Sequence, residues 1–86
     1  MNSLFIVGTP IGNLQDITLR ALETLNSVGV ILTEDTRTTR KLLSAYALKT
    51  KLLSYNEQNH HRRLPGIMKM LTSIDVALVS EAGMPR

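Results

Sequence analysis

The segment VGTPIGNLQDITLRA, Val7 to Ala21, joins two different kinds of element. The apolar run that leads into it, Leu4 to Val7, is typical of a strand buried on both faces. Two glycines and a proline within Gly8 to Gly12 then end the strand in a sharp turn. Such a turn lets backbone N–H groups approach an anion. The segment matches neither the nucleotide P-loop nor G-x-G-x-x-G, so a ligand-binding loop and a simple tight turn are both left open.

The rest of the chain alternates between short apolar runs and helical patterns. Further strands are predicted at Val30 to Leu32, weakly at Leu52 to Leu53, and at Asp75 to Ser80. Helices are predicted with Asn13 or Asp16 as the first cap and with Thr36 or Thr38 opening the second. A third is predicted with Pro65 in its first turn and an apolar face of Leu64, Ile67, Met68 and Leu71. This alternation predicts an α/β fold with right-handed βαβ units and a mostly parallel sheet.

Length and composition narrow the class of protein. The 86 residues allow one small domain, and the formal net charge of +3 is too mild to indicate a partner by itself. There is no cysteine, which excludes disulfides and thiolate metal sites. Adjacent His60 and His61 would point about 100° apart on a helix, so no metal site is expected. The amino-terminal apolar run is too short for a leader or a membrane span, and we expect a cytoplasmic protein without a membrane partner.

Three polar or glycine-rich segments follow predicted strands: GTPIGN, TEDTR and SEAGMP. In open α/β sheets, ligands bind beyond the carboxyl ends of the strands. The predicted architecture therefore brings these three segments together around one cleft.

The segment TEDTRTTRK concentrates charge at the start of a predicted helix. Arg37 lies three and four residues before Arg40 and Lys41, so these like charges would repel on one helical face. A bound nucleic-acid phosphate would offset that repulsion. Glu34 and Asp35 could favour the helix N-terminus, pair with the arginines, or serve as a general base, and spacing does not choose among these roles.

Read together, VGTPIGNLQDITLRAL, ILTEDTRTTRKLL, LLSYNEQN and DVALVSEAGMP resemble the opening of the small-subunit ribosomal RNA methyltransferase I family, which is similar to the tetrapyrrole methylases. The resemblance covers nearly the whole chain. It implies transfer of a methyl group from S-adenosyl-L-methionine to the ribose 2′-hydroxyl of a cytidine in 16S ribosomal RNA. It also implies a homodimer.

The resemblance assigns roles to individual residues. Glu34 falls where related methylases carry an acidic group near the reaction centre, and it is the candidate base. Arg37, Arg40 and Lys41 match basic positions that face RNA. The methyl donor is implied to contact the first and last of the three segments, at Pro10, Ile11, Ser80, Glu81, Ala82, Gly83 and Met84. In the last segment, Glu81 and Met84 stand where the family usually carries Asp and Thr.

Members of that family are longer and have two domains. Residues 1–86 are therefore interpreted as an incomplete amino-terminal domain, with the carboxyl-terminal domain absent, and the chain alone is expected to be inactive. Two alternatives remain: a non-catalytic fragment that binds RNA or dimerises, and a methylase that acts on a small tetrapyrrole.

Overall fold

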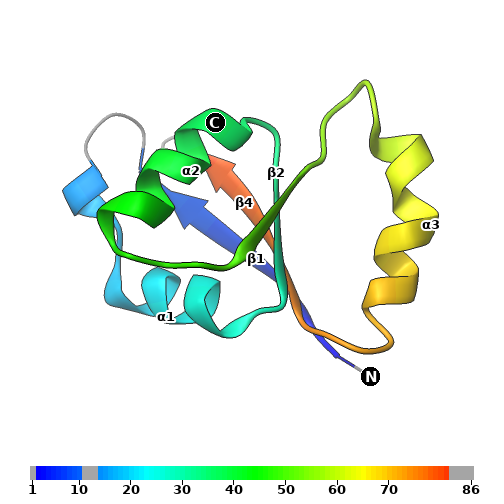
Figure 1. Ribbon diagram of the computed structural model, residues 1–86, viewed down its shortest axis with the longest axis horizontal. Helices are drawn as coiled ribbons and strands as arrows, with labels where there is room; N and C mark the ends of the chain where they lie inside the picture. The colour runs from blue at the N-terminus through cyan, green and yellow to red at the C-terminus, as the bar shows by residue number, and fades with distance from the viewer. Residues whose placement is uncertain (1, 11–13, 82–86) are drawn as a thin grey trace.

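A computed structural model describes residues 2–10 and 14–81 of the chain (Figure 1). Its elements in chain order are β1 (Leu4–Thr9), a 3-10 turn (Leu14–Asp16), α1 (Leu19–Ser27), β2 (Val30–Thr33), α2 (Thr36–Ala45), β3 (Lys51–Ser54), α3 (His60–Met70) and β4 (Val76–Glu81). Each predicted strand is present, including the weakly indicated third one.

The four strands form one parallel sheet in the order β1-β4-β2-β3. Helices α1 and α2 cover one face and α3 the other, so the predicted α/β architecture is confirmed (Figure 1). Gly8 pairs with Ser80 and Thr33 with Ser54, which aligns the strand ends. All four carboxyl ends therefore lie along the same edge of the sheet.

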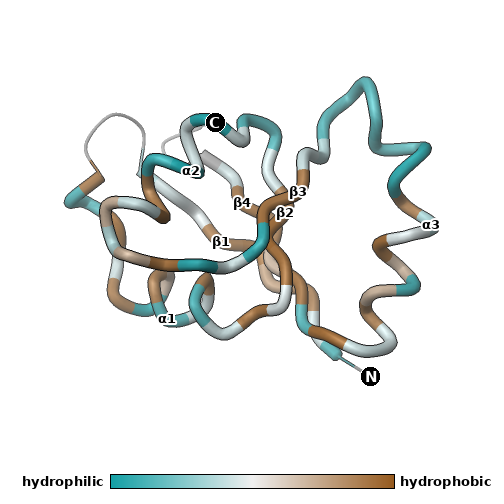
Figure 2. The backbone as a smooth tube through the Cα atoms, viewed as in Figure 1, coloured by the Kyte–Doolittle hydropathy of each residue, from teal (hydrophilic) through white to brown (hydrophobic). Residues whose placement is uncertain are grey.

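The core lies on both faces of the sheet because alternate side chains of a strand point to opposite faces. Ile31 packs with the α1 and α2 residues Leu25 and Leu42, whereas Val30 packs on the opposite face with Ile67 of α3. These apolar strand segments form the hydrophobic centre of the tube in Figure 2, and the loop between β3 and α3 is hydrophilic. The buried central strands β2 and β4 thus hold in place the loops that follow their carboxyl ends.

The residues that cap the first two helices are Thr18 and Asp35. Thr18 caps α1 by accepting a hydrogen bond from the Ala21 amide at 3.0 Å, and the chain from Leu14 to Asp16 forms a 3-10 turn instead. The predicted cap Asp16 is therefore wrong, and Asn13 lies outside the described residues. Helix α2 begins at Thr36, one of the two residues predicted to open it, and Asp35 is its cap. A short acceptor side chain suits any of these positions, so geometry decides which one is used.

The predicted start of α3 is wrong, and only part of its predicted apolar face is buried. The helix begins at His60, and Pro65 lies in its interior, where it cannot donate to the carbonyl of His61. Ile67 is buried, but Leu64 and Met68 are 44% and 59% exposed. The helix lies over β2 and β4, and only one side of its apolar stripe reaches the sheet.

Strand β1 is less buried than predicted. Its register places it at the edge of the sheet beside β4, and Leu4, Phe5 and Ile6 are exposed, Ile6 by 65%. Only Val7 and Thr9 point into the core formed with α1 and α2. The expectation of a strand covered on both faces is wrong because α3 does not extend over β1. The predicted homodimer stays a prediction.

Candidate functional site

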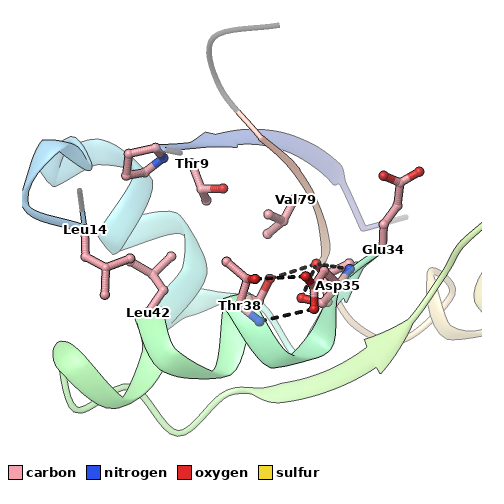
Figure 3. Close-up of a pocket in the computed structure, with 10 residues that line it drawn as sticks. Thr9, Leu14, Glu34, Asp35, Thr38, Leu42 and Val79 are labelled. Atoms are coloured by element: carbon pink, nitrogen blue, oxygen red, sulfur yellow. Dashed lines mark hydrogen bonds between the residues drawn. The ribbon is translucent and has the colours of Figure 1, made fainter. Parts of the chain in front are cut away.

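The described parts of the three predicted segments, Gly8 to Pro10, Thr33 to Arg37 and Ser80 to Glu81, lie along the carboxyl edge of the sheet. Thr9 is buried, and its hydroxyl donates to the Ser80 carbonyl at 3.5 Å, which links the ends of β1 and β4. Figure 3 shows Thr9, Val79 and Glu34 around the same hollow, reached from three different strands. Residues 11–13 and 82–86 lie outside the described part of the chain.

The turn after β2 is held by a network of hydroxyl and carboxylate groups. The buried hydroxyls of Thr33 and Thr39 lie 2.7 Å apart and share a hydrogen bond, which ties the strand end to α2. The Asp35 carboxylate accepts from the amides of Arg37 at 3.0 Å and Thr38 at 3.3 Å, and from the Thr38 hydroxyl at 2.9 Å. These bonds hold the start of α2 in place.

The two adjacent carboxylates therefore have different roles. The Thr38 hydroxyl, then the Thr38 amide, hold the pKa of Asp35 below its usual range, because these hydrogen bonds favour the charged form. Asp35 is occupied as the helix cap. Glu34 is exposed and points away from this network (Figure 3). Of the roles that the sequence left open, helix capping belongs to Asp35, and Glu34 is the carboxylate available to a ligand.

Glu34 stands between two hollows. One, of about 50 Å³, lies over α2 and is lined by Thr9, Pro10 and Thr33 among others. The second, of about 430 Å³, lies toward β3 and the start of α3. Glu34 and Val79 line both hollows. The candidate base thus lies on the boundary between the two hollows.

The structure places the predicted donor-site residues only in part. Pro10 lines the smaller hollow and Ser80 the larger one. Glu81 is the last residue of β4, in register with Thr9. Ile11, Ala82, Gly83 and Met84 lie outside the described residues.

The predicted basic cluster forms one surface of α2. Arg37, Arg40 and Lys41 are exposed and line the same shallow hollow along the helix. Arg40 also lines an adjoining hollow with Lys49 and Lys51, so the cationic surface continues to the start of β3. No carboxylate lines either hollow in the described part of the chain. Sequence reasoning missed Lys49 and Lys51 because they follow α2 outside any motif.

Two aromatic side chains of the larger hollow were also missed. Tyr55 follows β3 and His60 begins α3, and both line the hollow beside Glu34. The sequence interpretation treated His60 only as a poor metal ligand. In the described residues no group of three or more His, Asp or Glu side chains could hold a metal ion. No helix in this part of the chain is long and apolar enough to cross a membrane.

Comparison with known proteins agrees with this architecture. The sequence profile of the tetrapyrrole (corrin/porphyrin) methylases matches residues 3–86. The chain belongs to the tetrapyrrole methylase family. One structural neighbour of this family member, provisionally described as a diphthine synthase from Entamoeba histolytica, superposes with a TM-score of 0.60 at 26% identity, over 92% of this chain and 30% of that one.

Curated relatives at higher identity confirm the resemblance seen in the sequence motifs. The chain is 56% identical to the ribosomal RNA small subunit methyltransferase I of Thermotoga maritima over 99% of its own length and 39% of the relative's. It is 49% identical to the protein of the same name from Bacillus subtilis, of which it spans 30%. This tetrapyrrole methylase family member therefore spans well under half the length of these relatives.

Proposed function

We propose that this chain supplies one wall of the active-site cleft of an S-adenosylmethionine-dependent methyltransferase that acts on the cytidine 2′-hydroxyl of small-subunit ribosomal RNA. The observation that carries the proposal is the position of Glu34. It is an exposed carboxylate between two hollows at the carboxyl edge of the sheet, while its neighbour Asp35 is occupied as a helix cap. The relatives named ribosomal RNA small subunit methyltransferase I support the choice of substrate.

Two described residues of the predicted donor site, Pro10 and Ser80, support the assignment of S-adenosylmethionine as the methyl donor by their position at the carboxyl edge of the sheet. Pro10 follows β1, and Ser80 is the residue before the end of the adjacent strand β4. Each of them lines one of the two hollows that Glu34 also lines. When bound, this cofactor supplies the methyl group. We assign Pro10 and Ile11 to its first contact segment and Ser80 through Met84 to its second.

In this proposal Glu34 orients the ribose 2′-hydroxyl and accepts its proton. Bound S-adenosylmethionine would supply the methyl group to the 2′ oxygen, and Glu34 would hold the proton that this oxygen loses. Arg37, Arg40 and Lys41 bind phosphates on either side of the target nucleotide and fix the register of the RNA. Holding the two reactants in line accounts for much of the rate enhancement expected of such a site.

The share of the relatives' length that this chain spans supports a two-domain interpretation, with residues 1–86 in the amino-terminal domain. A second domain would form the opposite wall of the cleft and complete the donor site. We therefore expect the 86-residue chain alone to bind RNA weakly and to transfer no methyl group.

The test uses a chimera in which this chain replaces the matching residues of the Thermotoga maritima relative. Transfer of tritiated methyl from S-adenosylmethionine to unmodified small ribosomal subunits is measured. Glu34→Gln should lower the rate about 10²- to 10⁴-fold. Asp35→Asn is the matched control, because it removes the same charge one residue away but keeps a capping side chain. Equal rates for Glu34→Gln and Asp35→Asn would refute the role of Glu34, and a chimera without transfer would refute the proposed activity.

RNA binding by the chain itself gives a second test. Removing cations that contact phosphates lowers the dependence of binding on salt, by about 0.7 in slope per contact for single strands. The double variant Arg37→Ala, Arg40→Ala should therefore reduce the slope by about 1.4. An unchanged slope would show that α2 does not face RNA. Binding with the expected slope in a chimera that transfers no methyl group would favour a non-catalytic RNA-binding role.

A further inference from the structure

The larger hollow has the size and walls of a nucleoside site. Its volume of about 430 Å³ falls within the range of small-molecule pockets. Leu78 and Val79 of β4 contribute apolar surface to it, and Tyr55 and His60 contribute rings. No residue role assigned above accounts for these two rings.

The rings of Tyr55 and His60 form a corner. Their centroids lie 6.2 Å apart and their planes meet at 81°. A planar base that stacks on one ring therefore presents its edge to the other, which is a favoured arrangement for aromatic groups. Tyr55 is partly buried against the core of β2, β4 and α3, so its ring is held in place. Such a rigid corner suits a flat heteroaromatic ligand.

Polar groups of the hollow complement a particular base edge. The side-chain oxygen of Asn56 accepts from the amides of Gln58 at 3.0 Å and Asn59 at 3.1 Å. This fixes the amide group and leaves its NH₂ as a donor. The carboxylate of Glu57, which also lines the hollow, acts as an acceptor. Cytosine presents an amino donor beside ring acceptors, whereas uracil presents a carbonyl at the amino position and would face this carboxylate unfavourably.

The hollow extends along the carboxyl edge from β4 to β3, with Ser80 of a predicted donor segment on its β4 side and Tyr55 and Asn56 on its β3 side. In the order β1-β4-β2-β3, the donor segments follow the adjacent strands β1 and β4. Glu34 follows β2, while Tyr55 and Asn56 follow β3, on the other half of the same edge. A methyl group transferred from the β1–β4 side of this edge to the β2–β3 side would pass Glu34. The β2–β3 half is therefore the place for the acceptor.

From this arrangement we infer that the larger hollow binds the acceptor nucleotide of the RNA, with its base in the corner of Tyr55 and His60 and its ribose toward Glu34. The inference rests on the proposed RNA methylation. It requires the target base to leave its stack, as other enzymes that modify nucleotides require. Preference for cytosine follows from the fixed Asn56 donor and the Glu57 carboxylate acceptor, because Glu34 faces the ribose.

The chain has two tyrosines and no tryptophan, which makes proton NMR a direct test. The 86-residue chain is titrated with cytidine 5′-monophosphate, uridine 5′-monophosphate and S-adenosylhomocysteine in turn. Tyr46 is an internal control, because its hydroxyl donates to the Leu14 carbonyl at 2.8 Å on the α1 and α2 face. The cytidine nucleotide should shift the ring protons of Tyr55 and His60, leave Tyr46 unmoved, and bind more tightly than the uridine nucleotide.

Variants separate stacking from folding. Tyr55→Phe keeps the ring and should bind the cytidine nucleotide like the parent, whereas Tyr55→Ala should weaken binding about 5- to 150-fold, the range for losing one stacked base. His60→Ala, in which the packed tyrosine remains, should also weaken binding. Equal affinity of Tyr55→Ala and the parent would overturn the inference.

Three further outcomes would also overturn it: no shift of either ring with the cytidine nucleotide, equal shifts of Tyr46 and Tyr55, or a response to S-adenosylhomocysteine alone. The last would make the hollow a donor site. Failure of the proposed function looks different. A chimera that transfers no methyl group while the Tyr55 ring still responds to the cytidine nucleotide refutes methylation and leaves the nucleotide site standing.

Discussion

Replacing glycine by alanine should have opposite effects on stability at Gly29 and at Gly66. Gly29 lies between α1 and β2, where an added Cβ would come within 2.8 Å of both Cβ and Cδ1 of Ile74. The Cβ of Ile74 is fixed to the backbone and cannot rotate away. Gly66 lies in the interior of α3, where an added Cβ meets nothing within 4 Å. Gly29→Ala should therefore destabilise the fold and Gly66→Ala should stabilise it.

The expected magnitudes follow from these contacts. Overpacking costs about 1–3 kcal/mol, and the reduced freedom of the unfolded chain offsets about 0.4–1 kcal/mol of that cost. Gly29→Ala should thus lose about 1–2 kcal/mol of unfolding free energy. Gly66→Ala should gain about 0.5–1 kcal/mol, because alanine is the better helix former. The amide of Gly29 also donates to the Asp75 carbonyl at 2.9 Å, so any shift would strain the start of both β2 and β4.

Urea unfolding followed by circular dichroism measures both effects. With a slope of about 1 kcal/mol/M, the midpoint should fall by about 1–2 M for Gly29→Ala and rise by about 0.5–1 M for Gly66→Ala. Adding Ile74→Ala to Gly29→Ala removes Cδ1 and Cγ1 but keeps Cβ, so it should relieve part of the cost in a double-mutant cycle. A midpoint for Gly29→Ala at or above that of the parent would refute the packing argument.

Three further predictions concern the turn after β2 and the end of α2. Asp35 has its pKa lowered by hydrogen bonds from Thr38, so its contribution to stability should be complete above about pH 4 and lost as the pH falls through the lowered pKa. Urea midpoints of the parent and Asp35→Asn should therefore converge between pH 5 and pH 2, and a constant difference would contradict the linkage. Thr39→Val should cost about 0.5–1.5 kcal/mol in a urea melt, because it removes the 2.7 Å partner of the buried Thr33 hydroxyl, which keeps its bonds to the Asp35 backbone, and replacing both threonines by valine should cost less than the sum of the single changes. Ala47 has φ of 57° in the αL position after α2, so Ala47→Gly should raise stability by about 0.5–1 kcal/mol in a thermal melt, and a lower melting temperature would count against strain there.

The site was only partly predictable from sequence. The segments TEDTR and GTPIGN could be placed at the cleft because strand ends share an edge in any parallel sheet. The sequence could not predict which of Glu34 and Asp35 caps α2 and which is available to a ligand, because this depends on the distance from each carboxylate to the amides of α2. Tyr55 lies in the segment LLSYNEQN, but no sequence pattern predicts that its ring lies beside that of His60. Their corner exists only because β3 and α3 pack beside β4.

The sequence by itself determined the order of strands and helices, the aliphatic core and the basic helix, because periodicity and charge spacing are properties of neighbouring residues. Only the tertiary structure decided that β1 is an exposed edge, that Thr18 and Asp35 are the helix caps, and that Glu34 lies between two hollows. Each of these depends on residues far apart in the chain. The local sequence indicates which residue types can act as a cap, an edge strand or a site carboxylate. The packing of distant segments decides how far apart these residues lie and how exposed they are.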